Sequence, residues 1–176
     1  MRVLVTLLCA ATVACAPAPV GEPFVPAQTQ RVTVSGFSLS FEVPAEFVPT
    51  DVAGGVAHGG PKGSPTFFTP IVVQPRSTQA PLSEVLEGLI QPWAEHPSFE
   101  LHRRTPIATG GVIALLYELS FELHDAPRRR LAVLVPTPGG VVDIALAANS
   151  ELLAQALPIF DHVLDSLIVT EREPRD

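Results

Sequence analysis

The stretch that decides the fold runs from Val112 to Ala148 and reads VIALLYELSFELHDAPRRRLAVLVPTPGGVVDIALAA. Its first part, Val112 to Leu123, alternates apolar and polar side chains. One face would carry Leu115, Tyr117, Leu119, Phe121 and Leu123, and the other Glu118, Ser120, Glu122 and His124. A period of two residues predicts a β-strand with one covered face and one wetter face.

Two further strands extend this stretch into a meander. Asp125 to Pro127 predicts a turn, and Arg129 to Val135 predicts the next strand. Pro136 to Gly140 has the composition of a hairpin turn, and Val141 to Ala148 is the last strong strand. Because tight turns join neighbouring strands in an antiparallel sense, these segments predict an antiparallel sheet.

The preceding part of the chain predicts three strands and a loop. Arg31 to Ser35 and Phe37 to Val43 both alternate, and Pro44 ends the second strand. Residues 50–65 contain five glycines and two prolines, which favours a long flexible loop. Thr66 to Gln74 is rich in β-branched and aromatic residues and predicts a strand, with an internal proline that indicates an edge or a bulge.

Helices are expected on either side of the meander. Pro81 suits a first helical turn, and an apolar stripe follows it at helical spacing. The stripe comprises Leu82, Val85, Leu86, Leu89, Ile90 and Trp93. We expect Trp93 to pack in the core, and residues 99–107 to form a strand after the helix.

After the meander, Asn149 and Ser150 are good residues to cap a helix. Residues 151–156 predict a helical segment, a second helix is expected to begin at Pro158, and residues 168–170 predict a closing strand. Consecutive strands with helices covering them define an α+β fold.

Two segments resemble a known family, the PsbP/Mog1-like domains. Gly36 to Pro44 (GFSLSFEVP) is similar to their first strand, and Pro158 to Val169 (PIFDHVLDSLIV) to their closing helix and strand. The resemblance spans residues 31–170 and extends to the DcrB-like and LpqN-like bacterial lipoproteins. It implies an α/β/α sandwich around a central, mainly antiparallel sheet of about six to seven strands, and a binding or accessory role without a catalytic motif.

The first fifteen residues resemble a bacterial lipoprotein signal. Arg2 precedes an uncharged run, Val3 to Ala14, which is too short to span a bilayer and ends at Cys15. We expect residues 1–14 to be a cleaved signal, and residues 15–30 to be a lipid-bearing Cys15 with a Pro/Ala-rich spacer. The folded domain would cover residues 31–170, with a charged tail at 171–176. A plain secretory cleavage after Ala16 or Ala18 is the alternative.

The residue after Cys15 and the cysteine count refine this interpretation. Ala16, not aspartate, follows Cys15, which for a Gram-negative lipoprotein implies the periplasmic face of the outer membrane. The two cysteines, Cys9 and Cys15, both lie in the predicted signal region. The folded domain therefore has no disulfide, no thiol nucleophile and no cysteine-ligated zinc.

Charge and motifs point away from nucleic acid and away from catalysis. The formal net charge is −7, whereas nucleic-acid binding needs a concentrated basic face. The basic run Arg128 to Arg130 is typical of a solvated turn or strand end. None of the five histidines pairs with another at helical metal-ligand spacing, so we predict no metal and no cofactor. Glu118, Glu122 and Asp143 could meet on one sheet face as the paired carboxylates of a hydrolase.

These observations predict a membrane-anchored envelope lipoprotein whose non-catalytic domain engages another envelope protein. Two alternatives stay open. One is a periplasmic protein that binds a small molecule in a pocket between sheet and helix. The other is a hydrolase with a site built across strands. A concave surface formed by the wetter sheet face, the 50–65 loop and Trp93 is the candidate binding region.

Overall fold

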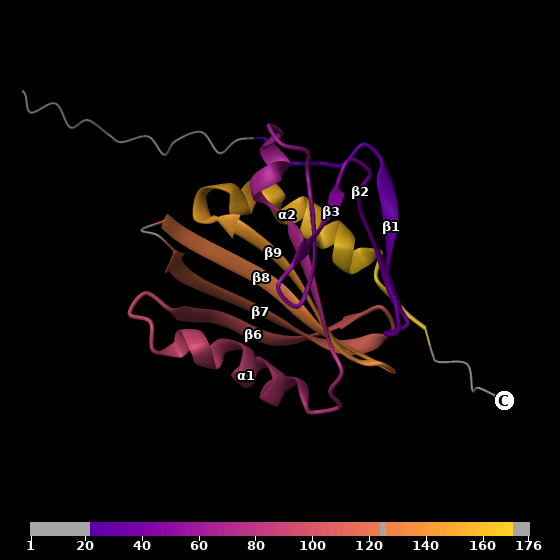
Figure 1. Cartoon of the computed structure of the whole chain (residues 1–176), viewed down its shortest axis with the longest axis vertical. Helices are drawn as coiled ribbons and strands as arrows, with labels where there is room; N and C mark the ends of the chain where they lie inside the picture. The colour runs from indigo at the N-terminus through magenta and orange to yellow at the C-terminus, as the bar shows by residue number, and fades with distance from the viewer. Residues whose placement is uncertain (1–21, 124–125, 171–176) are drawn as a thin grey trace, which may run out of the picture.

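The computed structural model describes residues 22–123 and 126–170. Cys15, the predicted signal and the predicted tail at 171–176 lie outside these residues. Within them the chain forms two antiparallel sheets and two α-helices (Figure 1). The larger sheet has the order β3-β4-β5-β9-β8-β7-β6 and the smaller one β1-β2-β10.

The strands of the larger sheet are β3 (Val48–Val52), β4 (Gly55–Gly59), β5 (Ile71–Arg76), β6 (Glu100–Thr109), β7 (Val112–Leu123), β8 (Ala126–Thr137) and β9 (Gly140–Asn149). Those of the smaller sheet are β1 (Thr29–Val34), β2 (Leu39–Pro44) and β10 (Ile168–Val169). The helices are α1 (Leu82–Ala94) and α2 (Ser150–Asp165), with a short 3₁₀ turn η1 (Pro65–Phe68). This architecture confirms the predicted α+β class, and the central antiparallel sheet has seven strands where about six to seven were expected.

The meander forms as predicted, with one correction. Strand β7 has the predicted bounds, and Thr137 pairs with Gly140 across a two-residue hairpin. The predicted turn at residues 125–127 is wrong, because β8 already begins at Ala126 and pairs with β7 from there. Only glycine suits position 140, where φ is +136° and a side chain would collide with the carbonyl oxygen of Arg76.

The two helices lie on opposite sides of the larger sheet (Figure 1). On the α2 side, helix α2 and the small sheet close the main core over the sheet. Its buried members include Leu39, Phe41, Val43, Val133, Ile144, Leu146, Leu153, Ile159, Phe160 and Val163. On the α1 side a smaller cluster comprises Leu86, Leu115, Tyr117, Leu119, Ala132, Leu134, Val141 and Ala145.

The predicted wetter face of β7 is only partly wet. Ala114 and Leu116 on this face are buried in the α2-side core, while Glu118 and Ser120 further along are half-buried. A strand can therefore keep its alternation and still be covered on both faces, because burial depends on what packs above each position.

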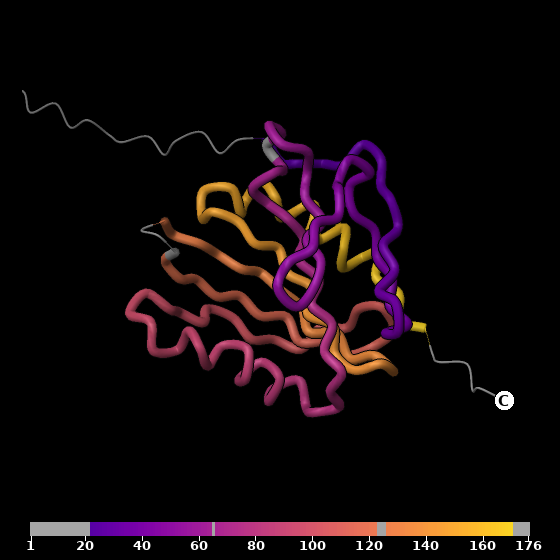
Figure 2. The backbone as a smooth tube through the Cα atoms, viewed as in Figure 1, coloured from indigo at the N-terminus to yellow at the C-terminus, as the bar shows by residue number. Residues whose placement is uncertain are grey.

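The glycine-rich segment is a correction of a different kind. Residues 50–65 are not one long loop. Strands β3 and β4 form a hairpin there, with Val52 paired to Gly55, and Figure 2 shows the chain doubling back. The strand predicted at residues 66–74 is likewise η1 followed by β5, which begins only at Ile71.

The chain ends of the domain also differ from expectation. One helix, α2, replaces the two predicted segments and continues through Pro158, because tertiary packing of Ile159 and Phe160 outweighs the lost backbone bond. The described fold begins before the predicted boundary at residue 31. Strand β1 starts at Thr29, and the Phe24 amide donates a 2.7 Å hydrogen bond to the Gln155 carbonyl.

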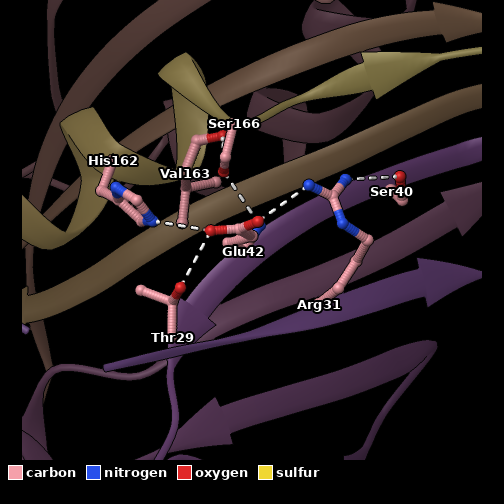
Figure 3. Close-up of polar contacts among 7 residues, drawn as sticks. All are labelled: Thr29, Arg31, Ser40, Glu42, His162, Val163 and Ser166. Carbon is pink, nitrogen blue, oxygen red and sulfur yellow. Dashed lines mark hydrogen bonds and ion pairs between the residues drawn. The ribbon is translucent and has the colours of Figure 1, made fainter.

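Polar contacts fasten the small sheet to α2 (Figure 3). The backbone N–H of Glu42 donates to the Ser166 hydroxyl at 2.9 Å. The Glu42 carboxylate accepts from Thr29 at 2.9 Å, from Arg31 at 2.8 Å and lies 3.3 Å from the His162 ring. These contacts join strands β1 and β2 to the C-terminal end of α2.

Candidate functional site

A buried polar triad lies on the α1 face of the larger sheet. Tyr117 of β7, Arg130 of β8 and Asp143 of β9 all point to this face. Asp143 pairs directly with Gln74 of β5, and residues directly opposite each other in antiparallel strands share a face. Four neighbouring strands therefore bring together the Gln74 amide, the Tyr117 hydroxyl, the Arg130 guanidinium and the Asp143 carboxylate.

The triad is closely hydrogen-bonded. The Tyr117 hydroxyl donates to both carboxylate oxygens of Asp143, at 3.0 and 3.1 Å. The Arg130 Nη2 donates to Asp143 at 2.6 Å and to the Gln74 side-chain oxygen at 3.4 Å. The Arg130 Nε lies 3.3 Å from the Tyr117 hydroxyl oxygen. Asp143 is fully buried, so this pairing is what allows a carboxylate inside the fold.

The surroundings of the triad raise the pKa values of both Tyr117 and Arg130. Burial, together with the neighbouring Asp143 carboxylate, raises the pKa of the Tyr117 hydroxyl far above its ordinary value. Burial alone would lower the pKa of the Arg130 guanidinium, but the Asp143 carboxylate and the Tyr117 hydroxyl together outweigh that effect and the pKa is raised. Tyr117 therefore stays a neutral donor and Arg130 stays a cation over the physiological pH range.

A cavity of about 440 Å³ lies between this triad and helix α1. We call it the α1 cleft. Its floor includes Gln74, Tyr117 and Arg130 from the sheet, with Arg76 also in the lining. Leu89 and Trp93 from α1 line the opposite wall. A volume of this size and a mixture of apolar walls with a few polar groups are typical of small-molecule sites.

A second cavity of about 340 Å³ shares Phe121 and Arg130 with the α1 cleft. Phe67 and Phe68 of η1 and Arg128 of β8 line it. The two cavities therefore meet on the same face of the sheet. No aspartate or glutamate lines either of them among the described residues, although the whole chain is acidic.

Trp93 does not pack in the core as predicted. Its side chain is 40% exposed at the mouth of the α1 cleft, and its ring lies 4.8 Å from that of Phe121 between centroids. The apolar stripe of α1 is correct in register, but Leu86 is its only fully buried residue. The helix leaves space beneath its C-terminal half, where the stripe was expected to seal the sheet.

The structure also corrects the arginine run. Arg128, Arg129 and Arg130 lie inside strand β8, not at a solvated turn. Arg129 forms an ion pair with Glu118 and Arg130 one with Asp143. Because successive strand residues alternate, these pairs occupy opposite faces of the sheet.

The same alternation separates the three candidate carboxylates. Asp143 contacts Tyr117 on the α1 face, whereas Glu118 and Glu122 are on the other face of β7. The expectation that all three share a face is wrong. The described residues therefore do not assemble the paired carboxylates that the hydrolase alternative required.

The four histidines that the structure describes lie apart, on or beside four different elements: His58, His96, His102 and His162. His124 lies outside the described residues. Within residues 22–123 and 126–170, no three His, Cys, Asp or Glu side chains are close enough to hold a metal ion. Burial lowers the pKa of His58 on β4.

None of the described helices has the length and hydropathy to cross a bilayer.

Comparison with known proteins gives the fold a class. No family model and no curated protein matches this sequence. Among solved structures, cyanobacterial PsbP (CyanoP) from Synechocystis sp. PCC 6803 is similar over 88% of this chain and 98% of its own, with 17% identity and a TM-score of 0.61. LpqN of Mycobacterium tuberculosis, which is involved in cell envelope biogenesis, matches over 81% of this chain and 91% of its own, with 14% identity and a TM-score of 0.53.

The chain therefore has a PsbP-like α+β fold, as the resemblance of its first strand and closing helix predicted. At such identities the similarity concerns the fold. The residues of the α1 cleft have to be interpreted from their own geometry.

Proposed function

We propose that this protein is an envelope lipoprotein, anchored through lipid on Cys15, whose PsbP-like domain binds another envelope protein without catalysing a reaction. The signal-like residues 1–15 support the anchor. The Pro/Ala-rich segment behind Cys15 would hold the domain away from the periplasmic face of the outer membrane. The similarity in fold to LpqN, an envelope biogenesis protein, is in keeping with such a location.

The observation that carries the binding role is an exposed aromatic pair. The side chains of Phe67 and Phe68 are 42% and 58% exposed, and their rings meet edge to face at 5.1 Å. Val48 of the neighbouring edge strand β3 is 56% exposed. Large apolar side chains gathered at a surface mark sites of protein association, because their burial on binding is favourable.

A second candidate function is small-molecule binding, and the α1 cleft favours it. Its arginine and amide groups converge on an apolar cavity that a metabolite-sized ligand fits. The hydrolase alternative has no comparable support, because Asp143 lies on the opposite face from Glu118. A binding protein with two surfaces, one for a partner and one for a ligand, accounts for both features.

Site-specific crosslinking in the native host tests the partner. A photoreactive phenylalanine in place of Phe68 should trap a defined envelope protein from intact membranes. Ile113 on β7 is the matched control, because its side chain is 64% exposed but does not line the cavity at Phe67 and Phe68. The same bands from both positions, or none from position 68, would contradict the proposal.

Processing tests the anchor. Cys15→Ala, or treatment with globomycin, should block lipid-dependent maturation and leave the precursor unprocessed, whereas Cys9→Ala should mature normally. If the Cys15→Ala chain is cleaved and released at the same size as the unsubstituted protein, the plain secretory alternative replaces the lipoprotein.

A further inference from the structure

We propose that the α1 cleft binds a small organic anion, with the acidic group on Arg76 and Arg130 and the apolar body between Trp93 and Leu89. This inference rests on the second function proposed above and adds the chemical class of the ligand. Of the proposed ligand groups, Arg76, Trp93 and Leu89 do not line the cavity at Phe67 and Phe68, whereas Arg130 lines both cavities.

The charge of the cleft is the first argument. Its lining contains two arginines and no acidic side chain among the described residues. The Arg130 cation is balanced by buried Asp143, but Arg76 has no carboxylate within ion-pair distance in the described chain. A cavity with surplus positive charge in a protein of net charge −7 selects anions.

The unsatisfied donors of Arg76 are the second argument. Its Nε is buried and has no hydrogen-bond partner among the described residues. The Nη groups of Arg76 likewise make no hydrogen bond to the described residues, and the half-buried side chain lines the cleft, so these donors are available to an anion there. Arg76 pairs with Val141 in the sheet, which places its side chain on the α1 face beside Gln74.

Arg130 supplies a pre-oriented second donor. Asp143, Tyr117 and Gln74 all hydrogen-bond to its Nε or Nη2, whereas its Nη1 has no hydrogen bond within the part of the chain that the structure describes. The guanidinium is therefore held in one orientation before a ligand arrives. A donor that is already ordered loses little conformational entropy on binding.

The apolar half of the ligand follows from the opposite wall. Trp93 lies against Phe121 at the mouth, and Leu89 and Ile90 line the helix side. An aromatic or short aliphatic body would lie against these side chains while its acidic group reaches the arginines. The cavity of about 440 Å³ is within the usual range for a small molecule.

A direct test uses the single tryptophan of the chain, Trp93, as the reporter. Full-length protein in a non-ionic detergent is titrated with 4-phenylbutyrate and, separately, with its neutral amide, 4-phenylbutyramide. The acid should change the Trp93 emission saturably, and the amide should bind about tenfold more weakly, because it lacks a charge-assisted hydrogen bond. Equal binding of the two, or no saturable change with millimolar acid, would overturn the proposal.

Two variants localise the acidic group. Arg76→Gln should weaken 4-phenylbutyrate binding by about tenfold. Arg103→Gln is the matched control, since Arg103 of β6 also lacks an ion-pair partner among the described residues but does not line the cleft. If the two variants bind alike, the site is elsewhere.

Arg130 needs a paired change, because Arg130→Gln alone leaves Asp143 without its cation. The double variant Arg130→Gln/Asp143→Asn should keep the fold, checked by its melting curve, and lose binding. Retained binding in a folded double variant would exclude Arg130 from the site. The crosslink at position 68 should persist in the Arg76→Gln variant, because Arg76 does not line the cavity at Phe67 and Phe68, so the outcomes for ligand and partner remain distinguishable.

Discussion

The two faces of the seven-stranded sheet are covered by helices of comparable length, with 13 residues in α1 and 16 in α2, yet they bury different things. Helix α2 fully buries five side chains, among them Ile159, Phe160 and Val163, and shares its core with the small sheet. Helix α1 fully buries only Leu86 and lies above a polar triad and a cavity.

This difference separates stability from binding in the same domain. The α2 face carries the larger buried apolar cluster, so its contribution to folding is large. The α1 face keeps a carboxylate, a guanidinium and a hydroxyl inside the fold, at a cost that their mutual hydrogen bonds offset. We infer that the α2 face holds the sheet in shape while the α1 face is available for a ligand.

The largest expected effect comes from the α2 face. Phe160→Ala should lower the free energy of unfolding by about 3–5 kcal/mol, because it opens a cavity in a close-packed core. Leu89→Ala on α1 removes a half-buried side chain at the cleft and should cost about 1 kcal/mol. Urea denaturation of both variants checks the comparison, and equal losses would contradict it.

A slightly smaller effect is expected from breaking the triad. Arg130→Met should lower the free energy of unfolding by about 3 kcal/mol, because it leaves the Asp143 carboxylate buried without a cation. The double variant Arg130→Met/Asp143→Leu should recover most of this loss. The same denaturation experiment measures both, and a double variant no more stable than Arg130→Met would contradict the unpaired Asp143 charge as the cause of the loss.

The smallest effect concerns pH, and it falls on the α2 side. Hydrogen bonding from Thr29 lowers the pKa of the Glu42 carboxyl below 4.5; partial burial opposes this, and Arg31 and His162 add to the lowering. A lowered pKa contributes stability above the unfolded-state pKa, which is lost as the pH falls through the folded-state value.

The stability advantage of unsubstituted protein over Glu42→Gln should therefore shrink between about pH 7 and about pH 3. Melting temperatures across this range measure it. Glu46→Gln, an exposed neighbour without a described hydrogen bond, should show no such trend.

Much of the fold could be predicted from local pattern. The alternation of residues 112–123 and the Pro138-Gly139 turn specify the meander, because strand period and turn chemistry are properties of neighbouring residues. The β3–β4 hairpin was missed because its strands are short and glycine-rich. Proline ordinarily begins or breaks a helix, so Pro158 predicted the start of a second helix. Packing against residues distant in the sequence overrides this local preference, and α2 continues through Pro158.

Less of the candidate site could be predicted. Asp143 was recognised as a candidate, but it was assigned to the wrong neighbours, Glu118 and Glu122. Its true partners, Tyr117 and Arg130, come from strands β7 and β8, and only the pairing register decides which of their side chains point to its face. Arg76 carried no sequence signal, because an arginine at a strand end is ordinarily solvated.

The sequence by itself determined where most strands and helices form and which residues of each strand share a face, because both follow from the period and chemistry of adjacent side chains. The tertiary structure decided which faces are sealed and which remain open. Helix α2 meets the sheet with a broad apolar stripe and the small sheet beside it, whereas α1 leaves Trp93 exposed above Arg130. Burial depends on segments that meet only after folding, so the α1 cleft became visible only once the strands were paired.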